Sequence, residues 1–386
     1  MEIKYPLAKE TIDSFDIQAL IEWLSTNPRL TMGGVTKEFE QAWADYIGTK
    51  YAVFVNSGSS ANLLMTYVAA IINKTENKKI VVPSVGWGTT IFPAMQFGLE
   101  PIMVDADPET FGIDLKQLEE ICIKEKPYAV IFVQVLGVPH KLEILKLQEK
   151  YGFILLEDGC AALGSEYEGG RKVGTIGDMS TFSFYFGHQL STIEGGMINT
   201  NDPNLYNLLL VARSHGWIKD LDKSTQEKIR EAHNIDGFHE PFTFILPGFN
   251  VRSTDLQAFI GLRQVAKANN ISSARNANHI LYAEKLKSNF SFQNWGKNIP
   301  VSISFGALAQ DTEHRTRVVN RLVAYGIETR IFSAGNLGKH PFWKDRYGEF
   351  NGEVANKIHS QGFFLPNYPE LTPEDIKWIC GIVNGA

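Results

Sequence analysis

Three short segments of this 386-residue chain carry residue types that could act together on a phosphorylated ligand. The first, Ser57-Gly58-Ser59-Ser60-Ala61, stands between a β-rich run and a helical stretch. Small residues there let backbone N–H groups approach an anion, and the helix dipole adds to the attraction. The second, Glu157-Asp158, directly follows the apolar run Phe153–Leu156, and ligands bind at the carboxyl ends of such strands in open α/β sheets. Taken alone, the first also fits a structural turn and the second a solvated acid.

The third segment runs from Ser180 to His188 and is followed by Glu194-Gly195-Gly196. A strand here would deliver the hydroxyl of Ser183 to a phosphate, and the loop after it would present His188. Asp158 could pair with a pyridinium nitrogen and keep it protonated, which makes such a ring an electron sink. A single histidine is more often structural than catalytic. The order and spacing of all three segments together are nevertheless specific.

The elements that must position these residues alternate between strands and helices. Continuous apolar runs that alternate with helical patterns predict a mostly parallel sheet covered on both faces, an α/β fold. The expected strands are Tyr51–Val55, Lys79–Pro83, Pro101–Asp105, Ala129–Val135, Phe153–Leu156, Thr181–Tyr185 and Gly196–Thr200. The expected helices in this part are residues 16–26, Thr36–Ile47, the stretch after Ser60, Leu115–Lys124 and Leu142–Lys150.

The pattern of expected helices and strands changes after about residue 250, which predicts a second, smaller α+β domain. A long helix over Thr254–Leu286 should lead to a strand at Val301–Phe305, followed by helices near Glu313–Tyr325 and Pro373–Val383. We therefore expect a large domain over residues 1–250 and a small C-terminal domain over residues 251–386. The first 15 or so residues are expected to pack on the small domain.

Composition excludes several classes of function. The net charge of −6 does not favour a broad basic face for nucleic acid. Cys122, Cys160 and Cys380 form no CxxC pair, so we expect no metal site and no disulfide framework. The sequence shows neither a signal-peptide pattern nor an apolar run long enough to span a bilayer. We therefore expect a cytoplasmic enzyme without a membrane partner.

Over nearly its whole length, the chain resembles the DegT/DnrJ/EryC1/StrS family of sugar aminotransferases. The motifs that carry the resemblance are Asn56–Ala61, Trp87, Glu157-Asp158, Phe182-Ser183-Phe184, Glu194-Gly195-Gly196, Arg213-Ser214-His215-Gly216 and Pro247–Gln257. The resemblance implies the pyridoxal-phosphate-dependent aspartate-aminotransferase fold (fold type I), with a seven-stranded, mostly parallel sheet between helices. It also implies pyridoxal 5′-phosphate or pyridoxamine 5′-phosphate as cofactor.

The resemblance further implies a role for each matching residue. Gly58, Ser59 and Ser183 would hold the cofactor phosphate, joined by Asn250 from a second subunit. Trp87 would stack on the ring, and Asp158 would pair with the ring nitrogen. A contact from a second subunit implies a homodimer with shared active sites.

One position departs from the family pattern. Ordinary members bind the cofactor covalently through a lysine in the loop after the Phe-Ser-Phe motif, and here that position is His188, with no lysine between Lys172 and Lys219. Histidine cannot form the imine, so we expect an untethered cofactor that rests as pyridoxamine phosphate. The imidazole can still act as a general base near neutral pH.

A histidine-bearing subset of the family removes the 3-hydroxyl of nucleotide-linked 4-keto-6-deoxy sugars, which implies a lyase of dideoxysugar biosynthesis, as in the pathway to colitose. The implied substrate is GDP-4-keto-6-deoxy-D-mannose, with glutamate as amino donor and ammonia as a product. Iron–sulfur relatives are excluded, because three scattered cysteines cannot supply four thiolates.

Candidate substrate contacts are His215, Arg252, Glu328 and Arg330, since arginine suits a diphosphate through paired hydrogen bonds. Ala161 stands where many relatives have Gln or Glu beside the ring hydroxyl. The aromatic stretch Phe238–Phe249 could cover a neighbouring subunit's site or pack in an interface. The alternatives are a sugar-nucleotide aminotransferase, natural or with its lysine replaced, a dehydratase of a GDP-keto-heptose, and a non-enzymatic regulator.

Overall fold

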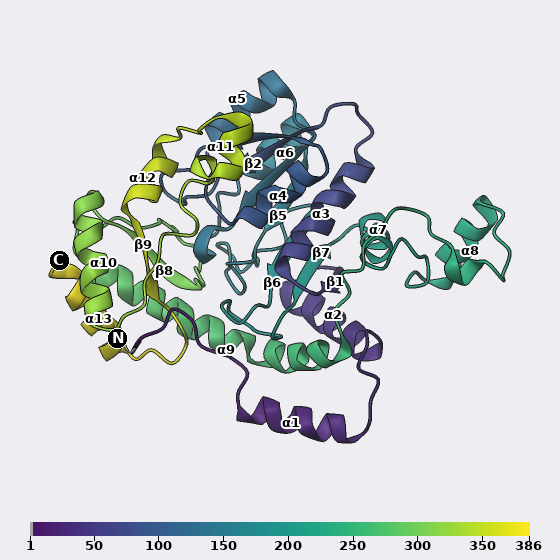
Figure 1. Ribbon diagram of the computed structural model, residues 1–386, viewed down its shortest axis with the longest axis horizontal. Coiled ribbons are helices and arrows are strands. Elements are labelled where there is room, and N and C mark those ends of the chain that lie inside the picture. The colour runs from purple at the N-terminus through teal and green to yellow at the C-terminus, as the bar shows by residue number, and fades with distance from the viewer. Residues whose placement is uncertain (1–2) are drawn as a thin grey trace.

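The computed structural model describes residues 3–386 and contains a seven-stranded sheet between two layers of helices (Figure 1). Its strand order is β1-β7-β6-β5-β4-β2-β3, and β7 alone runs antiparallel to both of its neighbours, β1 and β6. The predicted mostly parallel sheet is therefore confirmed. The strands are β1 Tyr51–Val55, β2 Lys79–Pro83, β3 Glu100–Val104, β4 Ala129–Val133, β5 Ile154–Asp158, β6 Met179–Ser183 and β7 Gly196–Thr200.

Helices connect the strands and extend into the C-terminal part of the chain. They are α1 Ser14–Ser25, α2 Gly34–Ile47, α3 Gly58–Ile72, α4 Gly88–Gln96, α5 Leu115–Glu125, α6 Ile144–Tyr151, α7 Pro203–Arg213, α8 Lys223–Ala232, α9 Asp255–Lys285, α10 Thr312–Ala324, α11 Pro341–Tyr347, α12 Glu353–Gln361 and α13 Pro373–Asn384. Short 3₁₀ turns occupy Val135–Gly137, Glu240–Phe242 and Leu337–Lys339.

Both faces of the large sheet are buried because its strands are apolar at successive positions. In β1, Phe54 packs into the cluster under α2, α5, α6 and α9, whereas Val53 and Val55 pack into the cluster under α3, α4 and α7. Successive side chains of a strand point to opposite faces, so an unbroken apolar run supplies both layers. This rigid sheet fixes the strand ends where the candidate site lies.

The C-terminal part contains a second sheet of two antiparallel strands, β8 Ser304–Leu308 and β9 Gly362–Pro366. The strand predicted at Val301–Phe305 thus begins three residues later, because Val301 and Ser302 bond instead to the loop around Gly137 and to α9. Near the other terminus, Tyr5 forms a β-bridge with Ile327. The division of the chain at residue 250 stays a prediction.

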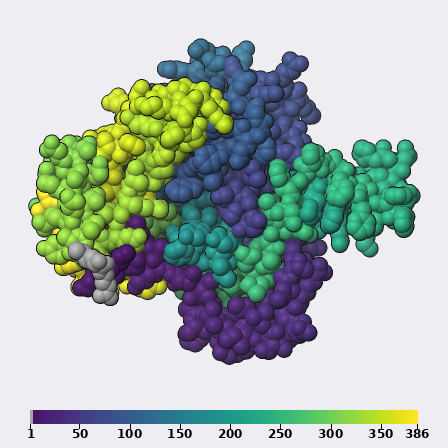
Figure 2. Space-filling view, in the orientation of Figure 1, coloured from purple at the N-terminus to yellow at the C-terminus, as the bar shows by residue number. Residues whose placement is uncertain are grey.

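The segment between α7 and α9, which includes α8, projects from the rest of the molecule (Figure 1), and Figure 2 shows the same arm standing clear of the surface. Phe238 on this arm is 86% exposed and Phe242 is 71% exposed. Exposed aromatic side chains that lie close together are typical of an interaction surface, whereas single ones are ordinary. Within residues 3–386, no helix is both long and apolar enough to cross a bilayer.

Candidate active site

A pocket of about 570 Å³ opens where β4, β5 and β6 end and α3 begins. It gathers residues from three distant parts of the chain, including the C-terminal part. Of the residues predicted from sequence, it is lined by Gly58, Ser59, Trp87, Asp158, Ser183, His188 and Arg330. The three segments singled out by their chemistry therefore meet in one cavity.

The N-terminus of α3 and the end of β6 form one wall of this pocket. Ser57 caps the helix by accepting a hydrogen bond from Ser60 N, which leaves the first backbone N–H groups of α3 available to an anion. A Cβ atom added to Gly58 would lie 2.6 Å from Cβ of Ser183. Glycine is thus required for the close approach that puts the Ser183 hydroxyl beside the helix N-terminus.

Asp158 is 4% exposed and its carboxylate is held by three donors. Oδ2 accepts hydrogen bonds from Nδ2 of Asn62 at 2.9 Å and from Oγ1 of Thr90 at 2.6 Å. Oδ1 accepts one from Cys160 N at 3.1 Å. Thr181 in turn donates to Oδ1 of Asn62 at 2.6 Å, which fixes the orientation of that amide. The carboxylate is therefore oriented before any ligand binds.

Sequence reasoning missed Asn62 and Thr90. The only signal for Asn62 was a polar residue inside the apolar helix α3, which is buried with 2% exposure. The acidic pair also needs a correction, since Glu157 and Asp158 end strand β5 rather than follow it. Because neighbours on a strand point to opposite faces, Glu157 is turned away from the pocket.

Glu157 lies in the interior of the protein. Burial raises the pKa of its carboxyl, while backbone N–H groups of Gly174 and Ile176 and the side chain of Gln134 donate to it. These bonds tie the loop before β6 to β5. Glu157 thus has a structural role beside the ligand-facing Asp158.

His188 lines the pocket from the loop after β6. Its Nδ1 is buried without a hydrogen-bond partner among residues 3–386. Desolvation lowers the pKa of the imidazole to about 4, against the attraction of Asp158. The ring is therefore neutral at physiological pH and has a free nitrogen that can take up a proton.

Two buried side chains, also missed from sequence, hold this loop. Nε2 of Gln189 donates to the carbonyls of Ala161 and Val301, both at 2.8 Å. Arg275 on α9 is 1% exposed and donates to the carbonyl of His188 at 3.4 Å. Gln189 bonds to segments that are distant in sequence, and Arg275 itself lies far from His188 in sequence. Local sequence patterns therefore did not predict either contact.

Of the remaining predicted residues, Asn250, His215 and Arg252 form a second group outside this pocket, and Glu328 lies apart from both. Nε of Arg252 donates to Oδ1 of Asn250 at 3.0 Å, and its Nη2 lies 3.3 Å from Nε2 of His215. Glu328 accepts a hydrogen bond from Leu7 N at 2.7 Å and is not among the residues that line the pocket. Within one chain, then, Asn250, His215 and Arg252 are together but apart from His188.

The donor set fits pyridoxal or pyridoxamine phosphate. The wall of Gly58, Ser59 and Ser183 offers hydrogen-bond donors at a helix N-terminus for a phosphate, and Asp158 is an oriented acceptor for a ring nitrogen. No lysine is among the lining residues, and Ala161 offers no side-chain hydrogen bond. Within residues 3–386 we found no group of His, Cys, Asp or Glu arranged to hold a metal ion.

Comparison with known proteins agrees with this arrangement. The DegT/DnrJ/EryC1/StrS aminotransferase family matches residues 10–384. GDP-4-keto-6-deoxy-D-mannose 3-dehydratase of Yersinia pseudotuberculosis is 35% identical over 394 residues, which cover 99% of this chain and 98% of that protein.

Solved structures give the same result. The structure of E. coli GDP-4-keto-6-deoxy-D-mannose-3-dehydratase with bound hydrated PLP superposes with a TM-score of 0.90 at 32% identity, covering 99% of this chain and all of the other. A structure of GDP-4-keto-6-deoxymannose-3-dehydratase with a trapped PLP-glutamate geminal diamine has a TM-score of 0.89 at 31% identity, covering 98% of this chain and all of the other.

Proposed function

Because the chain belongs to the DegT/DnrJ/EryC1/StrS aminotransferase family, we propose that it is a pyridoxal-phosphate-dependent lyase that removes the 3-hydroxyl of GDP-4-keto-6-deoxy-D-mannose. One observation carries the proposal: His188, and no lysine, lines the pocket beside Asp158 and Ser183. A cofactor held there has no amine to bond to, so it stays free to carry the amino group to and from the substrates.

The residues have distinct tasks in this proposal. Gly58, Ser59 and Ser183 bind the phosphate, Trp87 covers the ring, and Asp158 accepts from the ring nitrogen. When bound, the cofactor supplies an electron-withdrawing ring that stabilises negative charge at the carbon bearing its amino group. His188 takes up a proton at an imidazole nitrogen and returns one to the departing 3-hydroxyl.

The overall reaction balances with glutamate as the reductant. The sugar exchanges its C3–OH bond for a C3–H bond, glutamate is oxidised to 2-oxoglutarate, and ammonia leaves with the nitrogen. This scheme needs no metal and no second redox centre. The trapped PLP–glutamate adduct in a similar protein supports glutamate as the donor.

An aminotransferase is the second candidate, because the family name describes that activity. It would need another group to restore the cofactor after each transfer, and the pocket offers no lysine for this step. A GDP-keto-heptose is an alternative substrate for the same dehydration, and the choice between hexose and heptose rests on the similarity to the hexose enzymes.

We also propose a homodimer with shared active sites. The exposed aromatic residues Phe238 and Phe242 lie on an arm that needs a partner surface to cover them (Figure 1). Asn250, together with His215 and Arg252, would then complete the partner's site. Sedimentation equilibrium tests the dimer, and a monomer at micromolar concentration would contradict it. Cell fractionation tests the cytoplasmic location expected from the sequence.

The function itself is tested by product analysis. The purified chain is incubated with pyridoxal phosphate, glutamate and GDP-4-keto-6-deoxy-D-mannose. The nucleotide sugars are then separated, and their masses are measured by mass spectrometry. We expect a GDP-linked 3-deoxy-4-keto sugar. A GDP-linked 4-amino sugar would instead identify an aminotransferase.

A further inference from the structure

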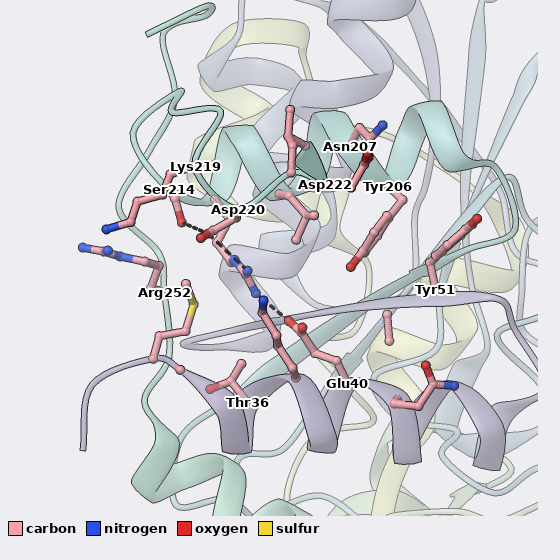
Figure 3. Close-up of a pocket in the computed structure, with 18 of the residues that line it drawn as sticks. Thr36, Glu40, Tyr51, Tyr206, Asn207, Ser214, Lys219, Asp220, Asp222 and Arg252 are labelled. Carbon is pink, nitrogen blue, oxygen red and sulfur yellow. Dashed lines mark hydrogen bonds and ion pairs between the residues drawn. The ribbon is translucent and has the colours of Figure 1, made fainter. Parts of the chain in front are cut away.

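Only two of the lysines and arginines in residues 3–386 are buried, Arg213 and Arg275, and their surroundings differ. Arg213 lines a pocket beside β1, and its two acidic neighbours, Glu40 and Asp220, are labelled in Figure 3. Its Nη1 donates to Oε1 of Glu40 at 2.6 Å, and its Nη2 lies 3.6 Å from Oδ2 of Asp220. The positive charge of Arg213 is thus paired where it is buried.

Arg275 is buried without a carboxylate partner. It lies on α9 with 1% of its surface exposed, and none of the ion pairs among residues 3–386 includes it. Burial lowers the pKa of its guanidinium to about 10, and the exposed Glu370 only partly opposes this effect. The guanidinium is therefore still charged at neutral pH. An unpaired charge in a protein interior must be stabilised by oriented dipoles instead.

Backbone carbonyls take the place of a carboxylate around Arg275. Nη1 donates to the carbonyls of Ser302 at 3.4 Å and Ile303 at 3.2 Å, and also to that of Asn367. Nη2 donates to the carbonyl of His188 at 3.4 Å. These bonds join α9, the segment before β8 and the segment after β9 to the loop that carries His188. They satisfy N–H groups, but carbonyl dipoles leave the positive charge uncancelled.

Arg275 reaches the candidate active site only through other residues. It is not among the residues that line the pocket, whereas two of its bonding partners, His188 and Ile303, are. Through their carbonyls it holds two separate parts of the pocket wall to α9. Any effect of Arg275 on the reaction must therefore pass through the position of these residues or through its electric field.

The charges around His188 act in opposite directions. Burial is the main cause that lowers the pKa of its imidazole, and the positive charges of Arg275 and Arg330 lower it further. The carboxylate of Asp158 and the backbone of Cys160 act against them and raise it. Two more titratable side chains line the same pocket, Tyr185 and Glu194. Of the two arginines, Arg275 is the buried one, so solvent screens its field least.

We propose that Arg275 is a positioning residue for His188, which it serves by fixing the loop through the His188 carbonyl and by holding an unpaired positive charge near the imidazole. A general base must be unprotonated before it can take up a proton. A positive charge in the low-dielectric interior near the ring favours that unprotonated form. The inference rests on the proposed function, which assigns the base to His188.

The test compares Arg275→Met with Arg275→Lys in the cofactor-loaded protein. Both replacements are unbranched side chains of similar length, and only lysine keeps the charge. The Cε1–H signal of His188 is followed by NMR as the pH is changed, and it is assigned by its absence from His188→Asn. We expect the pKa of His188 to rise by about one unit in Arg275→Met, because a neighbouring positive charge is gone. In Arg275→Lys it should stay near its value in the unmodified chain.

Turnover gives a second readout with a definite sign. Because protonated His188 cannot accept a proton, kcat should fall as the pH falls through the pKa of His188. The acidic limb of the kcat profile should therefore move to higher pH in Arg275→Met. Arg213→Met is the matched control, since it removes the other buried arginine, whose charge is not among those that act on His188. It should lower the free energy of unfolding and leave the pKa of His188 unchanged.

Two results would overturn the proposal. One is an unchanged pKa of His188 in Arg275→Met, and the other is an equal rise in Arg275→Lys, which would trace the effect to packing rather than to charge. Circular dichroism at each pH checks that the variants are folded. If Arg275→Met does not fold, Arg275→Gln replaces it with the same expected rise, because glutamine keeps N–H donors for the carbonyls and lacks the charge. The NMR titration needs no turnover, so a failed dehydration assay would count against the proposed function alone.

Discussion

Thr90 donates a hydrogen bond of 2.6 Å to Oδ2 of Asp158, the carboxylate that faces the candidate cofactor site. With the bond from Asn62 to the same oxygen, it fixes how Asp158 meets a ring nitrogen. Both side chains line the pocket, and the hydrogen bonds that they donate go to Asp158. Their effect on the reaction therefore passes through Asp158.

Replacing Thr90 by Val removes one of these bonds with little change of shape. A hydrogen bond to a charged group contributes about 1.5–3 kcal/mol to stability, so we expect the free energy of unfolding to fall by about that amount. We also expect weaker cofactor binding, because Asp158 is then less well oriented. Absorbance titration with pyridoxal phosphate measures this. The control is Thr66→Val on α3, because the buried Oγ1 of Thr66 has no partner to lose among residues 3–386. Equal affinity in the Thr90 variant would contradict the role of this bond.

A methyl group added at residue 58 should lower both the stability of the protein and its affinity for the cofactor. Gly58→Ala puts a Cβ 2.6 Å from Cβ of Ser183, so α3 and β6 must separate at the phosphate-binding wall. Overpacking of this kind costs about 1–3 kcal/mol, and we expect a loss of that size in the free energy of unfolding together with weaker cofactor binding. Urea unfolding and absorbance titration measure the two effects.

Gly381→Ala is the matched control, since Gly381 lies within α13 with nothing within 4 Å of an added Cβ. That variant should gain about 0.5–1 kcal/mol of stability from helix propensity. If both variants behaved alike, the close approach of Gly58 to Ser183 would not matter.

Much of the sheet was predictable because each of its strands has a recognisable local sequence pattern. The runs at Tyr51–Val55 and Gly196–Thr200 coincide with β1 and β7. They are bounded by polar or glycine turns and contain β-branched and aromatic residues, which favour strands. The strand β9 at Gly362–Pro366 was not predicted, because its identity as a strand depends on pairing with β8, more than 50 residues away.

The site was predictable only in part, for a similar reason. Asp158 and Ser183 stand at the ends of β5 and β6, and His188 lies in the loop after β6, so the sequence pattern and the fold coincide there. Thr90 donates to Asp158, and Gln189 holds the loop of His188 by donating to the distant carbonyls of Ala161 and Val301. No local sequence pattern predicts either set of bonds. Long-range hydrogen bonds of this kind become visible only when the strands are placed side by side.

Buried histidines should make the apoprotein less stable in mild acid. Desolvation lowers the pKa of the buried His279 to about 3 and that of the buried His140 to about 4, below the ordinary value of 6.5. Between pH 6.5 and about 4 the unfolded chain binds protons that the folded chain does not. The free energy of unfolding must therefore fall as the pH falls through this window, by about 1.4 kcal/mol per pH unit for each such histidine.

Urea unfolding of the apoprotein at several pH values measures this slope. His279→Asn should make it shallower by about 1.4 kcal/mol per pH unit, since one buried titrating group is gone. The exposed His233→Asn is the control and should leave the slope unchanged. A slope that His279→Asn does not alter would show that this histidine is protonated in the folded chain.

His188→Asn separates cofactor binding from catalysis. Asparagine keeps a polar side chain of similar reach but cannot take up a proton. We expect cofactor affinity close to that of the unmodified chain and deoxygenation slower by about 10²- to 10⁴-fold, the usual contribution of a general base. Full turnover in this variant would assign the base to another residue.

Dehydration with an untethered cofactor is tested by the stoichiometry of ammonia release. The holoenzyme is given GDP-4-keto-6-deoxy-D-mannose and excess glutamate, and ammonia and consumed sugar are measured in the same samples. We expect one ammonia for each sugar consumed, because a cofactor that is not tethered near His188 gives up its nitrogen in every cycle. Consumption of the sugar without ammonia, with an amino sugar in its place, would contradict it.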